Sequence, residues 1–329
     1  MFESSLAKEM TAYLELRKLS VAKSTILQDE RVLTMLDKYL QENNYSGQKL
    51  TEEILEAWML TLTGKSKTRK RKVEVVRNFS KYLSSIGHES FLPNSPREKS
   101  DYIPYIYSDE ELQSILYYAD RLQSQNLGSG RIVVQMKIPM LIRILYGCGT
   151  RLGETVSLQR KDIDFNAGTI FLRNTKFSKE RKIPVHESLL AILERYCMAM
   201  GILSKPDAFL FPGRNPNRHY TTRQVDFWFS KILRLANIDQ RKRPANERGA
   251  CLHCLRHVFV LKSMQQLEAA GRPVDMNDLL LPTYLGHNCL IDTDRYMRFS
   301  GVQVPDALDA FEGYAAGLIP RIEVPHAEE

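Results

Sequence analysis

The stretch Asp162-Ile-Asp-Phe-Asn-Ala-Gly-Thr-Ile-Phe-Leu-Arg173 interrupts a chain whose apolar residues otherwise have helical spacing. Its Asn-Ala-Gly centre predicts a turn, and the apolar residues on either side predict two antiparallel strands, 162–165 and 169–173. Arg181-Lys-Ile-Pro-Val185 has the composition of a third short strand. The sequence therefore predicts a mainly α protein with one small antiparallel β-sheet, an α+β fold.

Helical periodicity surrounds this sheet on both sides. Before it, Ser108-Asp-Glu-Glu111 has the pattern of a capping box, and a helical stretch follows as far as Tyr146. After it, helices are predicted over 188–200, 222–236, 253–270 and 276–281. Residues 1–92 predict a separate bundle of four short amphipathic helices, the last over 71–86.

The segment that follows this bundle contains two prolines and polar residues without periodicity, which indicates a linker. The predicted organisation is a helical domain over 1–92, a linker over 93–107, a second domain over 108–300 and a tail over 301–329. Within the tail, 305–318 has apolar residues at helical spacing.

Composition limits the class of protein only broadly. The chain has 329 residues, 43% of them hydrophobic and 26% charged, which suggests two domains with real cores. A formal net charge of +7 permits a nucleic-acid partner without requiring one. The beginning of the chain does not resemble a signal peptide, and no apolar run approaches the ~18 residues of a membrane span. Five cysteines, an odd number, indicate reduced thiols and a cytosolic protein.

Two basic runs are candidate contacts to a phosphate backbone. Like charges at a helix start are unfavourable because the helix dipole is also positive there, and phosphates would relieve both effects. The alternative for the first run is a solvated loop and helix start. The candidates are Lys65, Lys67, Arg69, Lys70, Arg71 and Lys72 in the first run, and Arg241, Lys242 and Arg243 in the second. Arg223, with His219 and Gln224, is a candidate base contact, and an exposed polar face is an equally good interpretation.

Several polar motifs suggest chemistry rather than packing. In Gly149-Thr-Arg151-Leu-Gly-Glu154, the carboxylate lies three residues beyond the arginine and can hold it, although a surface ion pair would have the same pattern. Lys176 lies between the second and third strands, where a solvated basic turn is the alternative.

Two further motifs follow towards the end of the chain. In His253-Cys-Leu-Arg256-His257, His253 and Arg256 project from one helix face. Leu285-Gly-His287 is followed nine residues later by Tyr296 in a polar segment, so an exposed phenol is plausible there, although a single tyrosine is usually a core residue.

A zinc site is the rival interpretation of the histidine cluster. Cys251, His253, Cys254 and His257 fall within seven residues, and Cys251-x-x-Cys254 has the spacing of zinc ligands. A structural zinc site usually needs a second pair of ligands, however, and the other cysteines are isolated. Metal binding is therefore disfavoured.

The ordered motifs resemble the tyrosine recombinase family, which includes phage integrases and Xer-type enzymes, over about residues 105–300. The resemblance implies that Arg151 and Arg256 clamp a phosphate and that Lys176 is a general acid. It further implies that His253 assists proton transfer, His287 hydrogen-bonds the phosphate, Glu154 is an accessory acid and Tyr296 is the nucleophile. Thr175-Lys176-Phe177 departs from the family's frequent Gly-Lys-Gly, so Lys179 is a possible substitute, and the Arg256–His287 spacing is longer than usual.

The same resemblance implies a site-specific recombinase that cleaves and rejoins DNA through a 3′-phosphotyrosine, without ATP, metal or another cofactor. Integration, excision or resolution of a mobile element would be its outcome. The implied partners are double-stranded DNA with a recombination site and three further copies of the chain, as a tetramer of two dimers, with possible accessory proteins. The tail 301–329 would dock on a neighbouring subunit, or alternatively in cis.

The expected location is the bacterial cytoplasm, at the nucleoid and not at a membrane. Three functions are alternatives to a recombinase. They are a type IB topoisomerase, a catalytically silent DNA-binding protein of the same fold, and a zinc-dependent regulator.

Overall fold

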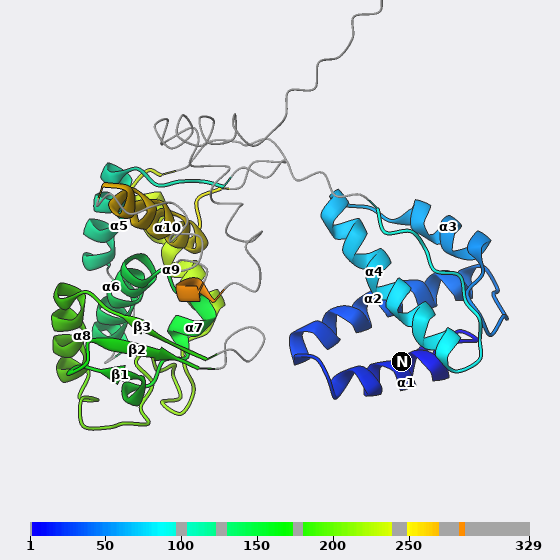
Figure 1. The fold of residues 1–329 in the computed structure, drawn as a ribbon, viewed down its shortest axis with the longest axis horizontal. Helices are drawn as coiled ribbons and strands as arrows, with labels where there is room; N and C mark the ends of the chain where they lie inside the picture. Colours follow the sequence, from blue (N-terminus) through cyan, green and yellow to red (C-terminus); the bar gives the residue numbers. More distant parts are fainter. Residues whose placement is uncertain are drawn as a thin grey trace, which may run out of the picture. The chain divides into compact units, whose positions relative to one another are not determined.

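The computed structural model describes residues 2–96, 104–122, 130–173, 180–238, 249–269 and 283–286 (Figure 1). The chain divides into two compact units, Met1–Asp101 and Tyr102–Glu329. Each unit has its own hydrophobic core. The predicted fold class, mainly α with one small antiparallel sheet, is confirmed.

The N-terminal unit is the predicted bundle of four helices. These are α1 (Ala7–Lys18), α2 (Lys23–Glu42), α3 (Glu52–Thr61) and α4 (Ser66–Ser85). Leu36, Trp58 and Phe79 are fully or almost fully buried at its centre. The chain then returns over this unit, because the Phe91 N–H donates to the Leu50 carbonyl (2.8 Å) and Arg77 Nη1 donates to the Pro93 carbonyl (2.6 Å).

The start of α4 corrects one boundary. The predicted helix began at Arg71, whereas α4 begins at Ser66 with Lys65 as its N-cap residue. Lysine and arginine are good helix formers, and they extend the helix ahead of its first buried residue, Val73. Most of the first basic run therefore forms the opening turns of α4 rather than a loop.

The C-terminal unit is organised around α6 (Gly130–Cys148), whose buried side chains include Ile138, Leu141 and Ile144. This helix contacts α5, α7, α8 and α10. The other helices among the described residues are α5 (Asp109–Asp120), α7 (Leu152–Val156), the 3-10 helix η1 (Arg160–Asp162), α8 (Glu187–Ala199), α9 (Thr222–Leu235) and α10 (Leu252–Ala269). The capping box predicted at Ser108 and Glu111 is confirmed at the start of α5.

The sheet has the order β1-β2-β3, from β1 (Ile163–Asp164), β2 (Thr169–Leu172) and β3 (Arg181–Pro184), all antiparallel. The strands are shorter than predicted, and β1 ends early because the turn begins at Asp164. Asp164 Oδ1 accepts the N–H groups of Asn166 (3.1 Å) and Ala167 (2.9 Å), and Gly168 has φ +63°. This local side-chain bonding replaces ladder pairing at the end of β1.

In the part of the chain that the structure describes, no helix has the length and apolar character needed to cross a membrane. The predicted helices 276–281 and 305–318 lie outside the described residues.

Candidate active site

Arg151 and Glu154 define the start of α7. Arg151 is its N-cap residue, just outside the helix. Its backbone N–H donates to Glu154 Oε2 (2.9 Å) and its Nη1 donates to Oε1 (2.9 Å). The Glu154 side chain is only 4% exposed, whereas that of Arg151 is 29% exposed. The predicted contact is therefore present, and it is not a surface ion pair.

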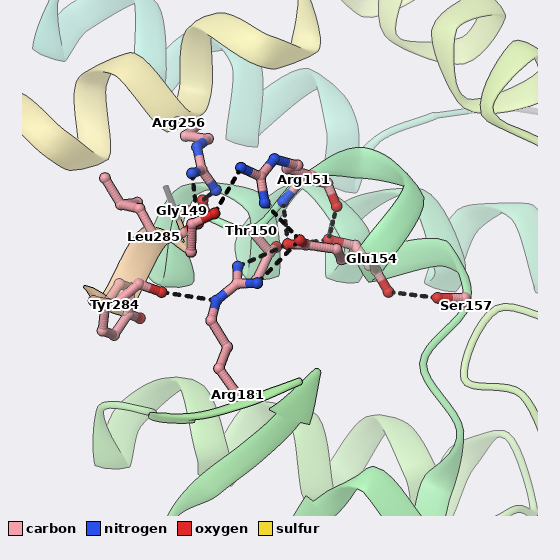
Figure 2. Close-up of polar contacts among 11 residues, drawn as sticks. Gly149, Thr150, Arg151, Glu154, Ser157, Arg181, Arg256, Tyr284 and Leu285 are labelled. Atoms are coloured by element: carbon pink, nitrogen blue, oxygen red, sulfur yellow. Dashed lines mark hydrogen bonds and ion pairs between the residues drawn. The ribbon is translucent and has the colours of Figure 1, made fainter. Parts of the chain in front are cut away.

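Arg256 projects from α10 into the same region. It is 2% exposed, and its two terminal nitrogens donate to backbone carbonyls, Nη1 to Gly149 (2.6 Å) and Nη2 to Leu285 (2.9 Å). Figure 2 shows the Arg256 guanidinium between Gly149, which lies shortly before α7, and Leu285 in the segment 283–286. The planar guanidinium thus fixes two chain segments that are far apart in sequence.

Gly149 makes this approach possible. Its φ is +56°, a conformation that residues with a Cβ rarely adopt. A Cβ at this position would lie 2.2 Å from Cδ1 of Phe259 on α10. Glycine therefore satisfies two requirements here, the turn before α7 and the close approach of α10.

Arg181, the first residue of β3, is a site residue that the sequence did not single out. Its Nη1 and Nη2 donate to Glu154 Oε1 (3.1 Å) and Oε2 (2.9 Å), and its Nε donates to the Tyr284 carbonyl (2.8 Å). In Figure 2, Arg181 reaches Glu154 from the side opposite Arg256. One signal was available: strand alternation places Arg181 on the same face as the buried Ile183.

The Glu154 carboxylate is consequently held by two arginines. Burial raises the pKa of its carboxyl, but hydrogen bonds and charge from Arg181, with those from Arg151, outweigh burial and lower that pKa overall. Glu154 is therefore ionised at neutral pH.

The segment 283–286 completes the described site. Gly286 has φ +65°, and its carbonyl accepts a hydrogen bond from Arg151 Nη2 (3.2 Å). Leu285, also in this segment, is fully buried. The residue preceding His287 therefore lies against Arg151.

His253 is exposed on α10, while His257 is 8% exposed and their ring centroids are 4.9 Å apart. His253 also lines a cavity of about 140 Å³ together with Thr150, Asp226 and Cys251. The exposure of His253 leaves its imidazole accessible to a ligand.

The cysteines of the zinc interpretation lie close together. Cys251 Sγ and Cys254 Sγ are 3.4 Å apart without a disulfide. Within the described residues, however, no group of three or more histidine, cysteine or acidic side chains could hold a metal ion. The zinc alternative therefore lacks a ligand set in this part of the chain.

The basic candidates on α4 are mostly at the surface. Lys65, Lys67, Arg69 and Arg71 are exposed, whereas Lys70 and Lys72 are half-buried. On α9, Arg223 is exposed, but the Gln224 side-chain oxygen accepts the Thr221 N–H (3.0 Å) in a capping box. Gln224 thus starts its helix, and its role as a base contact stays a prediction.

Several predicted residues lie outside the described residues. They are Lys176, Lys179, His287, Tyr296, Arg241, Lys242, Arg243 and the tail 301–329. The structure therefore brings together Arg151, Glu154 and Arg256 from the predicted set and adds Arg181.

Comparison with known proteins decides the family. Residues 108–272 match the model of the phage integrase family, and this match covers half of the chain. The chain belongs to the phage integrase family. Its members are tyrosine recombinases, enzymes that cleave and rejoin DNA in site-specific recombination. The predicted family and enzyme class are confirmed, and the topoisomerase alternative is not favoured.

Relatives within the family match over most of the chain. A putative integrase/recombinase y4rB of Sinorhizobium fredii is 26% identical over 94% of this chain and 98% of its own length. The tyrosine recombinase XerD of Pseudomonas putida is 28% identical over 71% of this chain and 78% of its own length.

Two solved structures share the fold. A XerH site-specific recombinase, in a post-cleavage complex with a palindromic difH substrate, matches with a TM-score of 0.67 at 19% identity, covering 88% of this chain and 80% of its own. A lambda integrase dimer bound to a core site matches with a TM-score of 0.63 at 14% identity, covering 90% and 78%.

Proposed function

We propose that Tyr296 of this chain attacks one phosphodiester of a specific DNA site, forming a 3′-phosphotyrosine and releasing a 5′-hydroxyl. A 5′-hydroxyl from another strand then attacks the linkage and restores the phosphodiester. The observation that carries this proposal is the convergence of two guanidinium groups on the backbone just before His287: Arg256 donates to the Leu285 carbonyl and Arg151 to the Gly286 carbonyl.

The two arginines have the chemistry of a phosphate clamp. Phosphoryl transfer needs charge stabilisation on the non-bridging oxygens and an in-line nucleophile. A guanidinium can give two parallel hydrogen bonds to those oxygens, which an ammonium cannot. Glu154 and the Gly286 carbonyl hold the partly exposed Arg151, and two carbonyls hold Arg256, so both are oriented before a ligand arrives.

Proton transfer requires further groups. A phenol has an ordinary pKa of about 10, so Tyr296 must lose its proton during attack. The exposed His253 and the field of the arginines are suited to assist that step. Lys176, or Lys179 in its place, protonates the leaving 5′-oxygen. His287 hydrogen-bonds the phosphate, and Glu154 holds Arg151.

Double-stranded DNA is the proposed partner. The exposed cations of α4 lie at a helix N-terminus without acidic residues in its first turn, a place that favours phosphate. Arg241, Lys242 and Arg243 are proposed as further backbone contacts and Arg223 as a base contact. The similar XerH recombinase is bound to its difH substrate and the lambda integrase dimer to a core site, which supports this partner.

The active assembly is proposed to be a tetramer of two dimers on DNA, with residues 301–329 contacting a neighbouring subunit and accessory proteins as possible partners. Such an enzyme would act on a mobile element or on a replicated chromosome in the bacterial cytoplasm. Its outcome would be integration, excision or resolution.

Covalent capture tests the nucleophile. A duplex selected from a randomised pool by the full chain is nicked close to the cleavage position, incubated without metal and run on a denaturing gel. An adduct that is lost in Tyr296→Phe is expected. Tyr117→Phe, which changes an exposed tyrosine on α5, is the matched control and retains the adduct. Persistence of the adduct in Tyr296→Phe contradicts the assignment.

A second substrate identifies the general acid. A 5′-phosphorothiolate leaves without protonation because a thiolate is a better leaving group than an alkoxide. Lys176→Ala and Lys179→Ala are compared on this substrate. If the cleavage defect of one variant disappears, the lysine replaced in that variant is the general acid. A defect that is equal on both substrates excludes that lysine.

A further inference from the structure

Arg181 is the side chain that joins the separate parts of the site. Its guanidinium donates twice to Glu154 and once to the Tyr284 carbonyl, and its side chain is only 11% exposed. It opens β3, where it pairs with Leu172 of β2. Three chain segments therefore meet at one guanidinium (Figure 2).

Each of these segments leads to a proposed catalytic residue. Arg181 follows Lys176 by five positions, Glu154 binds the Arg151 guanidinium, and Tyr284 precedes His287 by three positions. A neighbouring glycine supports the same arrangement. A Cβ on Gly286 would lie 2.9 Å from Arg181 Nη1, so the backbone before His287 packs directly against this guanidinium.

The electrostatics of the shared carboxylate indicate what Arg181 does. Glu154 Oε1 accepts from both Arg151 Nη1 (2.9 Å) and Arg181 Nη1 (3.1 Å), while Oε2 accepts from Arg181 Nη2 (2.9 Å) and the Arg151 backbone. If Glu154 were paired with Arg151 alone, its carboxylate would compensate the charge of Arg151 and hold that guanidinium more closely. Because Arg181 shares the carboxylate, the two arginines and Glu154 have a net charge of about +1 (2 − 1), which attracts a second anion.

We propose that Arg181 is a positioning residue: by sharing the Glu154 carboxylate, it orients Arg151 for the scissile phosphate and prevents Glu154 from compensating the whole charge of Arg151. This inference rests on the proposed function, in which Arg151 binds that phosphate. Arg181 itself does not contact the substrate. It acts through Glu154 on Arg151, and through the Tyr284 carbonyl on the segment that carries His287.

The test separates an electrostatic role from a merely structural one. Single-turnover cleavage is measured on two duplexes that differ only in the scissile linkage, a phosphate or an uncharged methylphosphonate. The methylphosphonate has less negative charge to stabilise, so it depends less on a charged Arg151. Arg181→Met is expected to slow cleavage of the phosphate roughly 10–100-fold, the scale of a small misplacement at a reacting centre.

On the methylphosphonate, Arg181→Met is expected to slow cleavage less than about threefold. Arg151→Met should likewise slow cleavage of the phosphate more than cleavage of the methylphosphonate, because both arginines act on the charge at the phosphate. Arg181→Lys keeps the charge without the fork and should fall between wild type and Arg181→Met on the phosphate. Arg143→Met removes an arginine that binds Asp120 with two 2.8 Å contacts outside the site, and it should leave both rates unchanged.

Equal slowing of both linkages by Arg181→Met overturns the proposal, because a general structural defect does not distinguish them. Unchanged cleavage of the phosphate overturns it as well. If Arg181→Met does not fold, Arg181→Lys is used instead, and its phosphate and methylphosphonate cleavage rates are compared. A ratio of these rates equal to that of wild type rejects the proposal. Failure of wild type to form an adduct, or an adduct that persists in Tyr296→Phe, refutes the proposed function instead.

Discussion

Glu154→Gln tests how far the C-terminal unit depends on the carboxylate between two arginines. The native carboxylate accepts four hydrogen bonds, three from guanidinium groups and one from the Arg151 backbone. In glutamine the NH₂ group cannot accept, so donors that met one oxygen now face another donor. The negative charge is lost at the same time, while both arginines remain.

The expected cost follows from burial. The Glu154 side chain is 4% exposed and that of Arg181 is 11% exposed. Removing one partner of a buried ion pair typically costs about 3–5 kcal/mol, because the remaining charge stays buried. For a unit of this size about 1 kcal/mol shifts the melting temperature by ~2–4 °C, so a decrease of roughly 6–20 °C is expected.

Tryptophan fluorescence is a suitable assay, because the two tryptophans lie in different units. Trp58 is buried in the N-terminal core, whereas Trp228 lies on α9. In a Trp58→Phe background, Trp228 alone reports unfolding of the unit that contains Glu154. Asp120→Asn is the matched control, since it breaks an exposed pair with Arg143 and should cost no more than about 1 kcal/mol.

The pH dependence gives an independent check. The folded-state pKa of Glu154 is lowered, so its stabilising contribution is present above the ordinary carboxyl pKa of 4.5 and is lost as pH falls through the lower folded-state value. Glu154→Gln should therefore lose less stability than wild type when the pH is taken below 4.5. A destabilisation below about 1 kcal/mol at pH 7, equal to that of the exposed control, refutes the reasoning.

Three further changes have defined outcomes. Gly149→Ala should lower stability by about 1–3 kcal/mol in denaturant unfolding, because the new Cβ meets Phe259 at 2.2 Å and φ is +56°; an unchanged midpoint contradicts the close approach. Burial lowers the pKa of Lys137 to about 8, so its contribution to stability rises as pH increases from about 8 towards 10.5 and the ammonium loses its proton; the stability of wild type relative to Lys137→Met should rise over that range. Cys251→Ala and chelator treatment should each leave cleavage within about twofold of wild type, as expected without a catalytic metal; a loss in both, restored by added zinc in wild type, would revive the zinc interpretation.

Sequence patterns predicted the features that depend on local interactions. Helical periodicity identified the longer helices of both units but not α7 or η1, and the Ser108–Glu111 pattern identified the cap of α5 because both partners lie within one turn. The Arg151–Glu154 contact was accessible for the same reason. The start of α4 was misjudged because the apolar pattern begins later than the helix, whose first residues are held by propensity alone.

Features that depend on tertiary contacts were not accessible in this way. The partners of Arg256 are backbone carbonyls at Gly149 and Leu285, and no side-chain pattern marks a carbonyl as an acceptor. Arg181 resembled an ordinary strand residue, because its partners are 27 and 103 positions away in the chain. The roles of Lys176, His287 and Tyr296 remain predictions.

The sharing of one carboxylate also bears on how quickly the protein would meet its substrate. Three arginines and one glutamate, 3 − 1, leave this small region with about two positive charges. Arginine does not lose its proton in the physiological range, so this local potential is insensitive to pH above the titration of Glu154. A concentrated positive potential steers polyanions and accelerates encounter, and salt weakens it over a screening length of about 8 Å at physiological ionic strength. The association rate with DNA should therefore fall as salt rises, even at constant pH.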